Sequence, residues 1–222
     1  MKKNFRQLQC AMILIMCIFQ VKTLYSQTLM VDHFDNMSTI ESEKFPGYVF
    51  TQEGYDIYYK NARVKLSRVT ICPRNGNKAL RIAYQLPPEY SWGNWLTIRH
   101  QLKAPMDLTM YQGLELKLKV ERPSPDIILR ITLSDLVNNN IKRDELWWFD
   151  FASNLLGERT KKWIRIRIPF SNAKLSYGEG ARHNDSELNL KKIFAYEINF
   201  VSSSKEKVEG AILLDSLRAY KK

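Results

Sequence analysis

Apolar and polar residues alternate along most of the chain after residue 27. In Leu114-Glu-Leu-Lys-Leu-Lys-Val120 every second residue is apolar, and Trp163-Ile-Arg-Ile-Arg-Ile-Pro169 repeats the pattern. A period of two predicts β-strands with one face toward a core and the other toward solvent. The predicted strands, in chain order, are Leu29–Phe34, Tyr48–Gln52, Asp56–Tyr59, Val64–Cys72, Ala79–Leu86, Trp95–Leu102, Leu114–Glu121, Asp126–Ser134, Leu146–Ala152, Trp163–Pro169, Ala195–Val201 and Ala211–Arg218.

Turn-forming residues separate these strands, as in Pro73-Arg-Asn-Gly-Asn77, Pro87-Pro88 and Pro123-Ser-Pro125. No long amphipathic helix is predicted, and one short helical turn is expected around Leu188–Phe194. Many short strands with half-polar faces predict an all-β fold, an antiparallel β-sandwich or jelly roll.

The first 27 residues have the pattern of a secretory signal peptide. Lys2, Lys3 and Arg6 form a basic start, residues 11–19 are apolar, and small polar residues follow. We expect cleavage near Ser26/Gln27 and one domain over residues 28–222. The apolar run is shorter than the ~20 residues of a bilayer span, so we expect no membrane span. The prediction is a bacterial protein that is secreted or periplasmic.

Charge and cysteine content narrow the possible partners. The 222 residues carry a net charge of +11, which falls to +7 when Lys2, Lys3, Arg6 and Lys22 are removed. The basic residues are spread along the chain without a nucleic-acid-binding motif, so we expect no nucleic acid partner. An acidic polysaccharide is compatible with this charge. Only Cys72 follows residue 27, which excludes an intrachain disulfide and a cysteine-based metal site there.

Two adjacent tryptophans stand in Asp144-Glu-Leu-Trp-Trp-Phe-Asp-Phe-Ala152. Successive side chains of a strand point to opposite faces. One face carries Trp147 with Phe149 and Phe151, and the other carries Trp148 with Asp150. Because the face with the phenylalanines is the more apolar, we predict that Trp147 packs on the core and that Trp148 points away from it.

Six segments together resemble a known type of domain: Val31-Asp-His-Phe-Asp-Asn36, Gly76–Ile82, Met106–Leu116, Ile127–Asp135, Trp163–Ser171 and Gly210–Leu217. In this order they resemble the jelly-roll carbohydrate-binding modules of the galactose-binding-like superfold, most closely family 11. The same pattern occurs in related sandwich families without known sugar ligands, including the complex I intermediate-associated proteins. The resemblance implies a non-catalytic protein that binds a polysaccharide, β-glucan-like or acidic, in a concave cleft. A glycan-degrading enzyme or a surface complex would then act on that polysaccharide in trans.

The residues suit that chemistry. A pyranose has apolar C–H faces, which stack on indole or phenol rings, and hydroxyls, which need polar side chains as partners. Aromatic and polar residues alternate on several predicted strands. The predicted ligand-binding residues are Trp148, Asp150, Arg130, Thr132, Arg99, Trp92, Trp95, Tyr55, Tyr58 and Asn199.

The resemblance also implies a structural calcium ion between the first strand, the Gly-Asn turn and the last strand. Asp35, Asn77 and Asp215 match those positions. Calcium takes about six to eight oxygen ligands, many of them backbone carbonyls, which a sequence does not display.

Two other functions stay open at this point. A jelly-roll glycosidase needs a carboxylate pair, and a polysaccharide lyase needs a base near an arginine. Candidate carboxylates are Asp135, Asp144, Glu145, Asp150 and Glu197, but no compact acidic motif joins them, so we expect no enzymatic activity. The other alternative is a structural or protein-binding sandwich in a cell-surface assembly.

Overall fold

The structure is a computed structural model, and its strands match the predicted ones with two additions. It describes residues 28–34, 40–42, 47–50, 55–60, 62–72, 77–88, 94–136, 144–151, 155–175, 187–202 and 204–221. The strands are β1 (Thr28–Asp32), β2 (Ile40–Ser42), β3 (Gly47–Phe50), β4 (Tyr55–Lys60), β5 (Arg63–Cys72), β6 (Asn77–Leu86), β7 (Asn94–Met106), β8 (Gly113–Arg122), β9 (Ile127–Leu136), β10 (Asp144–Asp150), β11 (Ile164–Pro169), β12 (Lys174–Leu175), β13 (Ile193–Ser202) and β14 (Val208–Tyr220).

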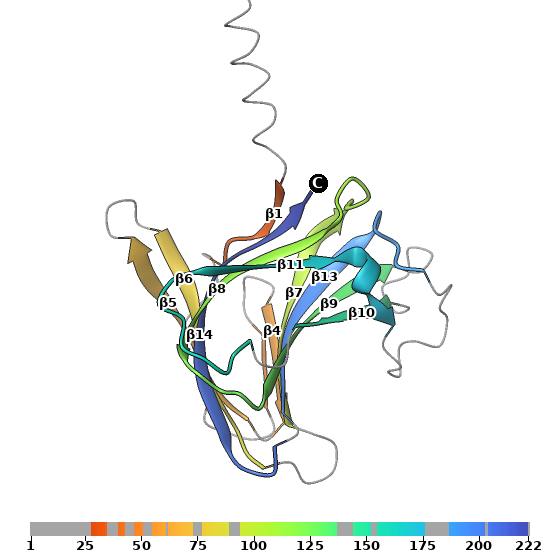
Figure 1. Cartoon of the computed structure of the whole chain (residues 1–222). Coiled ribbons are helices and arrows are strands. Elements are labelled where there is room, and N and C mark those ends of the chain that lie inside the picture. The colour runs from red at the N-terminus through yellow and green to blue at the C-terminus, as the bar shows by residue number, and fades with distance from the viewer. Residues whose placement is uncertain are drawn as a thin grey trace, which may run out of the picture.

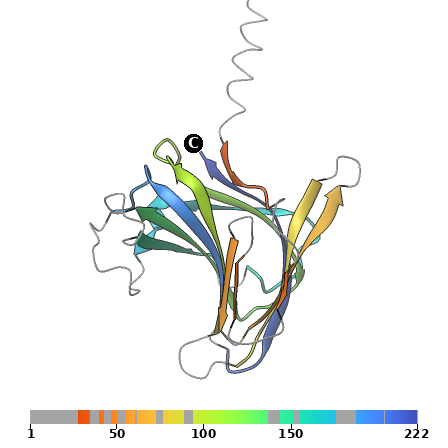
Figure 2. The ribbon, with the colours of Figure 1, turned by 180° about the vertical axis from the view of Figure 1, so that it is seen from behind.

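Two antiparallel sheets form a sandwich, as the alternation predicted (Figures 1 and 2). Sheet A has the order β11-β8-β14-β6-β5-β2, and β1 lies beside the last residues of β14. Sheet B has the order β12-β10-β9-β13-β7-β4-β3. In Figure 1, β14, β6 and β5 form the left-hand layer, and β13, β9 and β10 form the right-hand layer.

The core lies between the facing sides of the two sheets. Leu116 and Leu118 of β8 are fully buried, and so is Ile131 of β9. The residues that alternate with them, such as Lys117 and Arg130, keep part of their surface in solvent. Burial of one face of each strand removes apolar surface from water at about 25 cal/mol per Å², which stabilises the sandwich.

Two short strands and the position of a helix were not predicted. The strands β2 and β12 have three and two residues, too few for an alternation to be visible. The helical turn expected around Leu188–Phe194 is wrong, because Ile193 begins β13 and pairs with β7 and β9. The described helix is a 3₁₀ turn, η3, at Phe170–Asn172.

The predicted signal peptide, residues 1–27, lies outside the described residues, so its cleavage stays a prediction. Among the residues that are described, no helix is long and apolar enough to cross a membrane.

Gly113, in the segment Met106–Leu116, stands where two strands pack closely together. A Cβ atom at this position would lie 2.1 Å from the carbonyl oxygen of Ile168, which is backbone of the paired strand β11. A glycine is therefore required for β8 and β11 to approach each other so closely, since no side chain can be accommodated against backbone at that distance.

A buried carboxylate connects the two sheets. Asp32, at the end of β1, accepts hydrogen bonds from the Tyr196 hydroxyl and, at 2.6 Å, from the Phe34 N–H. The Nδ1 atom of His100 lies 2.8 Å from the same carboxylate. Tyr196 and His100 belong to β13 and β7 of sheet B, so this one side chain holds β1 of sheet A against the opposite layer.

Tyr84 of β6 makes the free energy of unfolding depend on pH under alkaline conditions. Burial raises the pKa of Tyr84 to about 12, against a smaller lowering by nearby groups that include Arg122. The folded protein thus favours the neutral phenol relative to an unfolded tyrosine, whose pKa is about 10. This contribution is complete below about pH 10 and is lost as the pH rises toward 12.

We expect the free energy of unfolding to fall by up to roughly 3 kcal/mol over this range because of Tyr84, since each pKa unit corresponds to a little over 1 kcal/mol. Urea unfolding at a series of pH values measures the slope. The variant Tyr84→Phe should fall less steeply above pH 10, and an equal slope in both proteins would contradict this assignment.

Candidate functional site

Most of the predicted ligand-binding residues lie on one surface, the face of sheet B that points away from the core. Antiparallel register places residues of neighbouring strands in rows across this face. One row runs Trp148, Thr132, Glu197 and Arg99, across β10, β9, β13 and β7. The next row runs Asp150, Arg130, Asn199 and Thr97 across the same strands.

Six of the eight residues in these two rows line a groove of about 260 Å³. This volume is close to the lower end of the roughly 300–1,000 Å³ that is typical of small-molecule pockets. The groove is open to solvent along the sheet and carries both aromatic and polar groups. Its lining residues are Trp95, Thr97, Arg130, Thr132, Leu146, Trp148, Glu197, Asn199 and Val201.

The two tryptophans of β10 face opposite ways, as predicted. Trp147 retains 6% of its surface in solvent and lies on the core side with Phe149 and Phe151. Trp148 lines the groove, and the guanidinium carbon of Arg130 lies 3.9 Å from the centre of its ring. This cation–π contact holds the indole ring in one orientation.

The charged side chains of the groove are held in ion pairs. Arg130 donates from Nε to Asp150 at 2.6 Å, and Lys174 of β12 approaches the other oxygen of Asp150 at 3.6 Å. Arg99 donates to Glu197 at 2.8 Å. Each arginine is thereby neutralised and held in one geometry, which prepares it to hydrogen-bond a ligand without rearrangement.

A chain of neutral hydrogen bonds orders the middle of the groove. The Thr97 hydroxyl donates to Asn199, whose amide nitrogen donates to the Thr132 hydroxyl at 2.9 Å. The bonds run from β7 through β13 to β9, so the position of each polar group depends on its neighbour. The floor of the groove is therefore a fixed set of donors and acceptors.

The prediction and the structure agree on the position of most of these residues. Five predicted residues line the groove: Trp95, Arg130, Thr132, Trp148 and Asn199. Asp150 and Arg99 reach it through their ion pairs with lining residues. Their roles in binding a ligand stay predictions.

The remaining predicted ligand residues are less well placed. Trp92 lies outside the described residues. Tyr58 of β4 is in register with Thr97 and so extends the second row. Tyr55 is in register with His100, whose ring packs edge-on against Tyr196, so this position does not belong to the rows of the groove.

Four groove residues were not among the predicted ligand contacts, namely Thr97, Leu146, Glu197 and Val201. Thr97 lies between Trp95 and Arg99 in the alternation, and that signal could have identified it. Leu146 and Val201 are apolar, and an apolar residue is by default assigned to the core. Alternation nevertheless puts Leu146 on the face of Trp148 and Val201 on the face of Asn199, and strand pairing then brings these residues together in the groove.

Four of the five carboxylates considered for catalysis separate into two groups, and the side chain of the fifth, Asp144, lies outside the described part of the structure. Asp150 and Glu197 face the groove and form ion pairs with arginines. Asp135 and Glu145 are opposite each other on β9 and β10, and each retains 1% of its surface in solvent. These two lie on the other side of sheet B from Trp148, so they do not contribute to the groove.

Topology brings together the three segments predicted to bind calcium. Pairing of β14 with β6 ends at Leu214 and Leu80, and pairing with β1 begins at Leu217, so Asp215 lies where the three strands meet. However, Asp215 forms an ion pair with Lys117. Asn77 is exposed and Asp35 lies outside the described residues.

The described residues thus do not form a ready-made calcium site, and among them no cluster of three or more His, Cys, Asp or Glu side chains could hold a metal. Calcium binding by Asp35, Asn77 and Asp215 stays a prediction, and it requires Asp215 to exchange Lys117 for the ion.

If Ca²⁺ binds to these residues, millimolar Ca²⁺ should raise the thermal midpoint relative to a chelator, since a ligand at 100 times its Kd stabilises by about 2.7 kcal/mol. Asp215→Asn should lose that shift. Equal midpoints with calcium and chelator would contradict the prediction.

Comparison with known proteins adds a likeness of fold. A family 11 carbohydrate-binding module from Clostridium thermocellum, solved in complex with a β-1,3-1,4-mixed-linked tetrasaccharide, matches with a TM-score of 0.60 and 16% identity, over 87% of this chain and 95% of that chain. A family 30 carbohydrate-binding module of a cellulosomal cellulase from the same organism matches with a TM-score of 0.51 and 12% identity, over 88% of this chain and 98% of that chain.

The chain has the jelly-roll fold of these modules. A second structure, the family 11 module of another cellulosomal cellulase of Clostridium thermocellum, agrees, with a TM-score of 0.58 and 16% identity over 88% of this chain and 95% of that chain. No family model matches the sequence. No curated protein matches it either. The resemblance predicted from six short segments is therefore confirmed for the fold.

Proposed function

We propose that this chain is a secreted, non-catalytic carbohydrate-binding protein that holds a polysaccharide in the groove of sheet B. The observation that carries the proposal is the groove itself, where Trp148 lies beside a fixed network of hydrogen-bonding side chains. A sugar ring can stack its C–H face on the indole while its hydroxyls meet Thr132, Asn199 and the paired arginines.

The charges of the groove favour a neutral glycan. Arg130 and Arg99 are each paired with a carboxylate, so an acidic sugar would meet Asp150 and Glu197 as well as the cations. Hydroxyls, by contrast, can accept from the guanidinium groups and donate to the carboxylates at the same time. A β-glucan-like polysaccharide is therefore the proposed ligand.

Likeness of fold supports this proposal without deciding the ligand. One of the similar modules was solved with a mixed-linked β-1,3-1,4 tetrasaccharide. A shared fold does not by itself carry a shared function, so the side chains of this groove must be tested directly. A glycan-degrading enzyme or a surface complex would use the bound polysaccharide in trans.

Affinity electrophoresis of residues 28–222 through gels that contain soluble polysaccharides tests the proposal. We expect retardation by mixed-linkage β-glucan and no shortening of the glycan after long incubation. Shortening of the glycan would indicate an enzyme. Migration unchanged by every neutral glycan would contradict the proposed function and favour a structural or protein-binding role.

A further inference from the structure

A second surface of the molecule carries more positive than negative charge, with one carboxylate, Glu158, among its cations. The segment before β11 reads Glu158-Arg-Thr-Lys-Lys-Trp-Ile-Arg165 and lies along the edge of sheet A. Thr160 donates its N–H to Val120 and accepts from the Val120 N–H through its hydroxyl, at 3.2 and 2.8 Å. These bonds fix the segment against β8, so its side chains keep a defined place on the surface.

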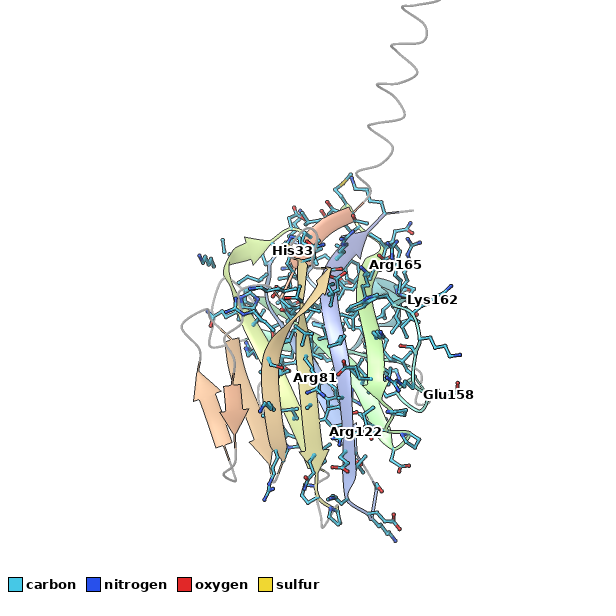
Figure 3. All side chains as sticks on the ribbon, turned by 90° about the vertical axis from the view of Figure 1, so that its left-hand side faces the viewer. His33, Arg81, Arg122, Glu158, Lys162 and Arg165 are labelled. Carbon is cyan, nitrogen blue, oxygen red and sulfur yellow. The ribbon has the colours of Figure 1, made fainter. Side chains whose placement is uncertain are left out.

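Five cations lie on this segment, on the edge strand β11 and on its neighbour β8, and we name them the basic strip: Arg159, Lys161, Lys162, Arg165 and Lys119. Among the residues that the structure describes, none of the five forms an ion pair. Figure 3 looks onto the outer side of sheet A, with Arg165 and Lys162 along its right-hand edge. Arg165 is moreover directly opposite Lys117 of β8, and like charges in that position destabilise a sheet.

Several other cations on the outer side of sheet A form ion pairs. Arg81 pairs with Glu121 at 2.6 Å, and Arg167, two residues after Arg165, pairs with Glu115 at 2.8 Å. The cations of the basic strip, by contrast, have no such partner among the described residues. From Arg159 to Arg165 the strip is at most about 20 Å long, which is enough for several units of an extended polymer.

We infer that the basic strip binds an acidic polysaccharide, independently of the groove. A line of cations fits a linear polyanion, whereas an anionic membrane would be matched by charge spread over a whole face. A single strand of nucleic acid would need exposed aromatic rings for its bases. The aromatic residue of the segment before β11, Trp163, is half-buried, and Lys117 lies over its ring at 5.2 Å.

This site is separate from the proposed function. The groove lies on the outer side of sheet B and its charges are paired, whereas the strip lies on sheet A and its charges are not. A neutral glycan and an acidic glycan could thus occupy the protein together. Such a protein would link two polysaccharides of different charge.

Affinity electrophoresis with polygalacturonate tests the strip. Replacing two cations in Lys119→Gln/Arg165→Gln should weaken retention about tenfold, since exposed charge contacts contribute up to about 1 kcal/mol each. The same variant should bind mixed-linkage β-glucan as the parent does, and its thermal midpoint should not fall, because the substitution removes the like charge opposite Lys117. The matched control Lys103→Gln/Lys205→Gln removes the same charge from exposed lysines elsewhere and should leave polygalacturonate retention unchanged.

Several results would overturn the inference. These are no retention by polygalacturonate, equal weakening in the control variant, or loss of that retention in the groove variant Trp148→Ala. Tighter retention by single-stranded DNA than by polygalacturonate would assign the strip to nucleic acid instead. Failure of β-glucan binding alone would contradict the groove proposal and leave the strip standing, so the two can fail separately.

Discussion

Trp148→Ala is expected to weaken the binding of mixed-linkage β-glucan at least thirtyfold while the fold remains intact. Trp148 lines the groove and keeps part of its ring accessible, beside Arg130 at 3.9 Å. Large aromatic residues at the centre of a binding surface typically contribute about 2 kcal/mol or more, roughly a thirtyfold change in Kd. Titration calorimetry with a β-glucan oligosaccharide measures the effect.

The neighbouring tryptophan provides the matched control. Trp147 is buried on the core side, so Trp147→Ala should cost about 3–5 kcal/mol of stability through lost packing. At a temperature where that variant is still folded, it should retain most of the affinity. Trp148→Phe, which keeps a ring in the groove, should also retain measurable binding. If Trp148→Ala lost stability as Trp147→Ala does, and lost no more affinity than Trp147→Ala, the assignment of Trp148 to a binding surface would be wrong.

Asp32→Ala is expected to lower the free energy of unfolding by about 3–5 kcal/mol. Removal of one partner from a buried, hydrogen-bonded charge leaves the other groups without their acceptor. Here the carboxylate accepts from the Tyr196 hydroxyl and the Phe34 N–H, and the His100 ring lies beside it. Because these groups come from both sheets, the loss should destabilise the sandwich as a whole, and urea unfolding should remain a single transition at a lower midpoint.

Asp107 supplies the comparison for this prediction. Its carboxylate accepts from the N–H and the hydroxyl of Thr109 at 2.9 and 2.7 Å. This carboxylate is exposed, and both hydrogen bonds reach a residue only two positions along the chain. These hydrogen bonds lower the pKa of Asp107. The lowered pKa keeps these hydrogen bonds in place at neutral pH, but because the carboxylate is exposed, Asp107→Ala should change the unfolding midpoint little. A loss of stability in Asp107→Ala as large as in Asp32→Ala would show that the link between the sheets is not the cause.

The strand pattern of this protein could be predicted because burial acts on each strand separately. Leu114, Leu116 and Leu118 alternate with polar residues, and each is fully buried in the folded protein. The same local rule separated Trp147 from Trp148. It did not find β12, whose two residues form a strand only because Trp147 and Trp148 of β10 pair with them.

The groove depended on information that no single strand contains. Arg99 and Glu197 lie 98 residues apart in the sequence, and nothing in either segment indicates that they pair. The row from Trp148 through Thr132 and Glu197 to Arg99 exists because β10, β9, β13 and β7 are neighbours in one register. A slip of one residue in any strand would turn its side chains to the other face.

The sequence by itself determined the class of fold, the core side of the clearly alternating strands and most of the residue types that a sugar needs. These properties follow from the period of two and from side-chain chemistry, which are local. Only the tertiary structure decided which residues meet: Asp215 with Lys117, Asp32 with His100 and Tyr196, and the uncompensated cations along the edge of sheet A. Charge pairing and groove shape depend on strand order and register, and those are set by the packing of the whole sandwich.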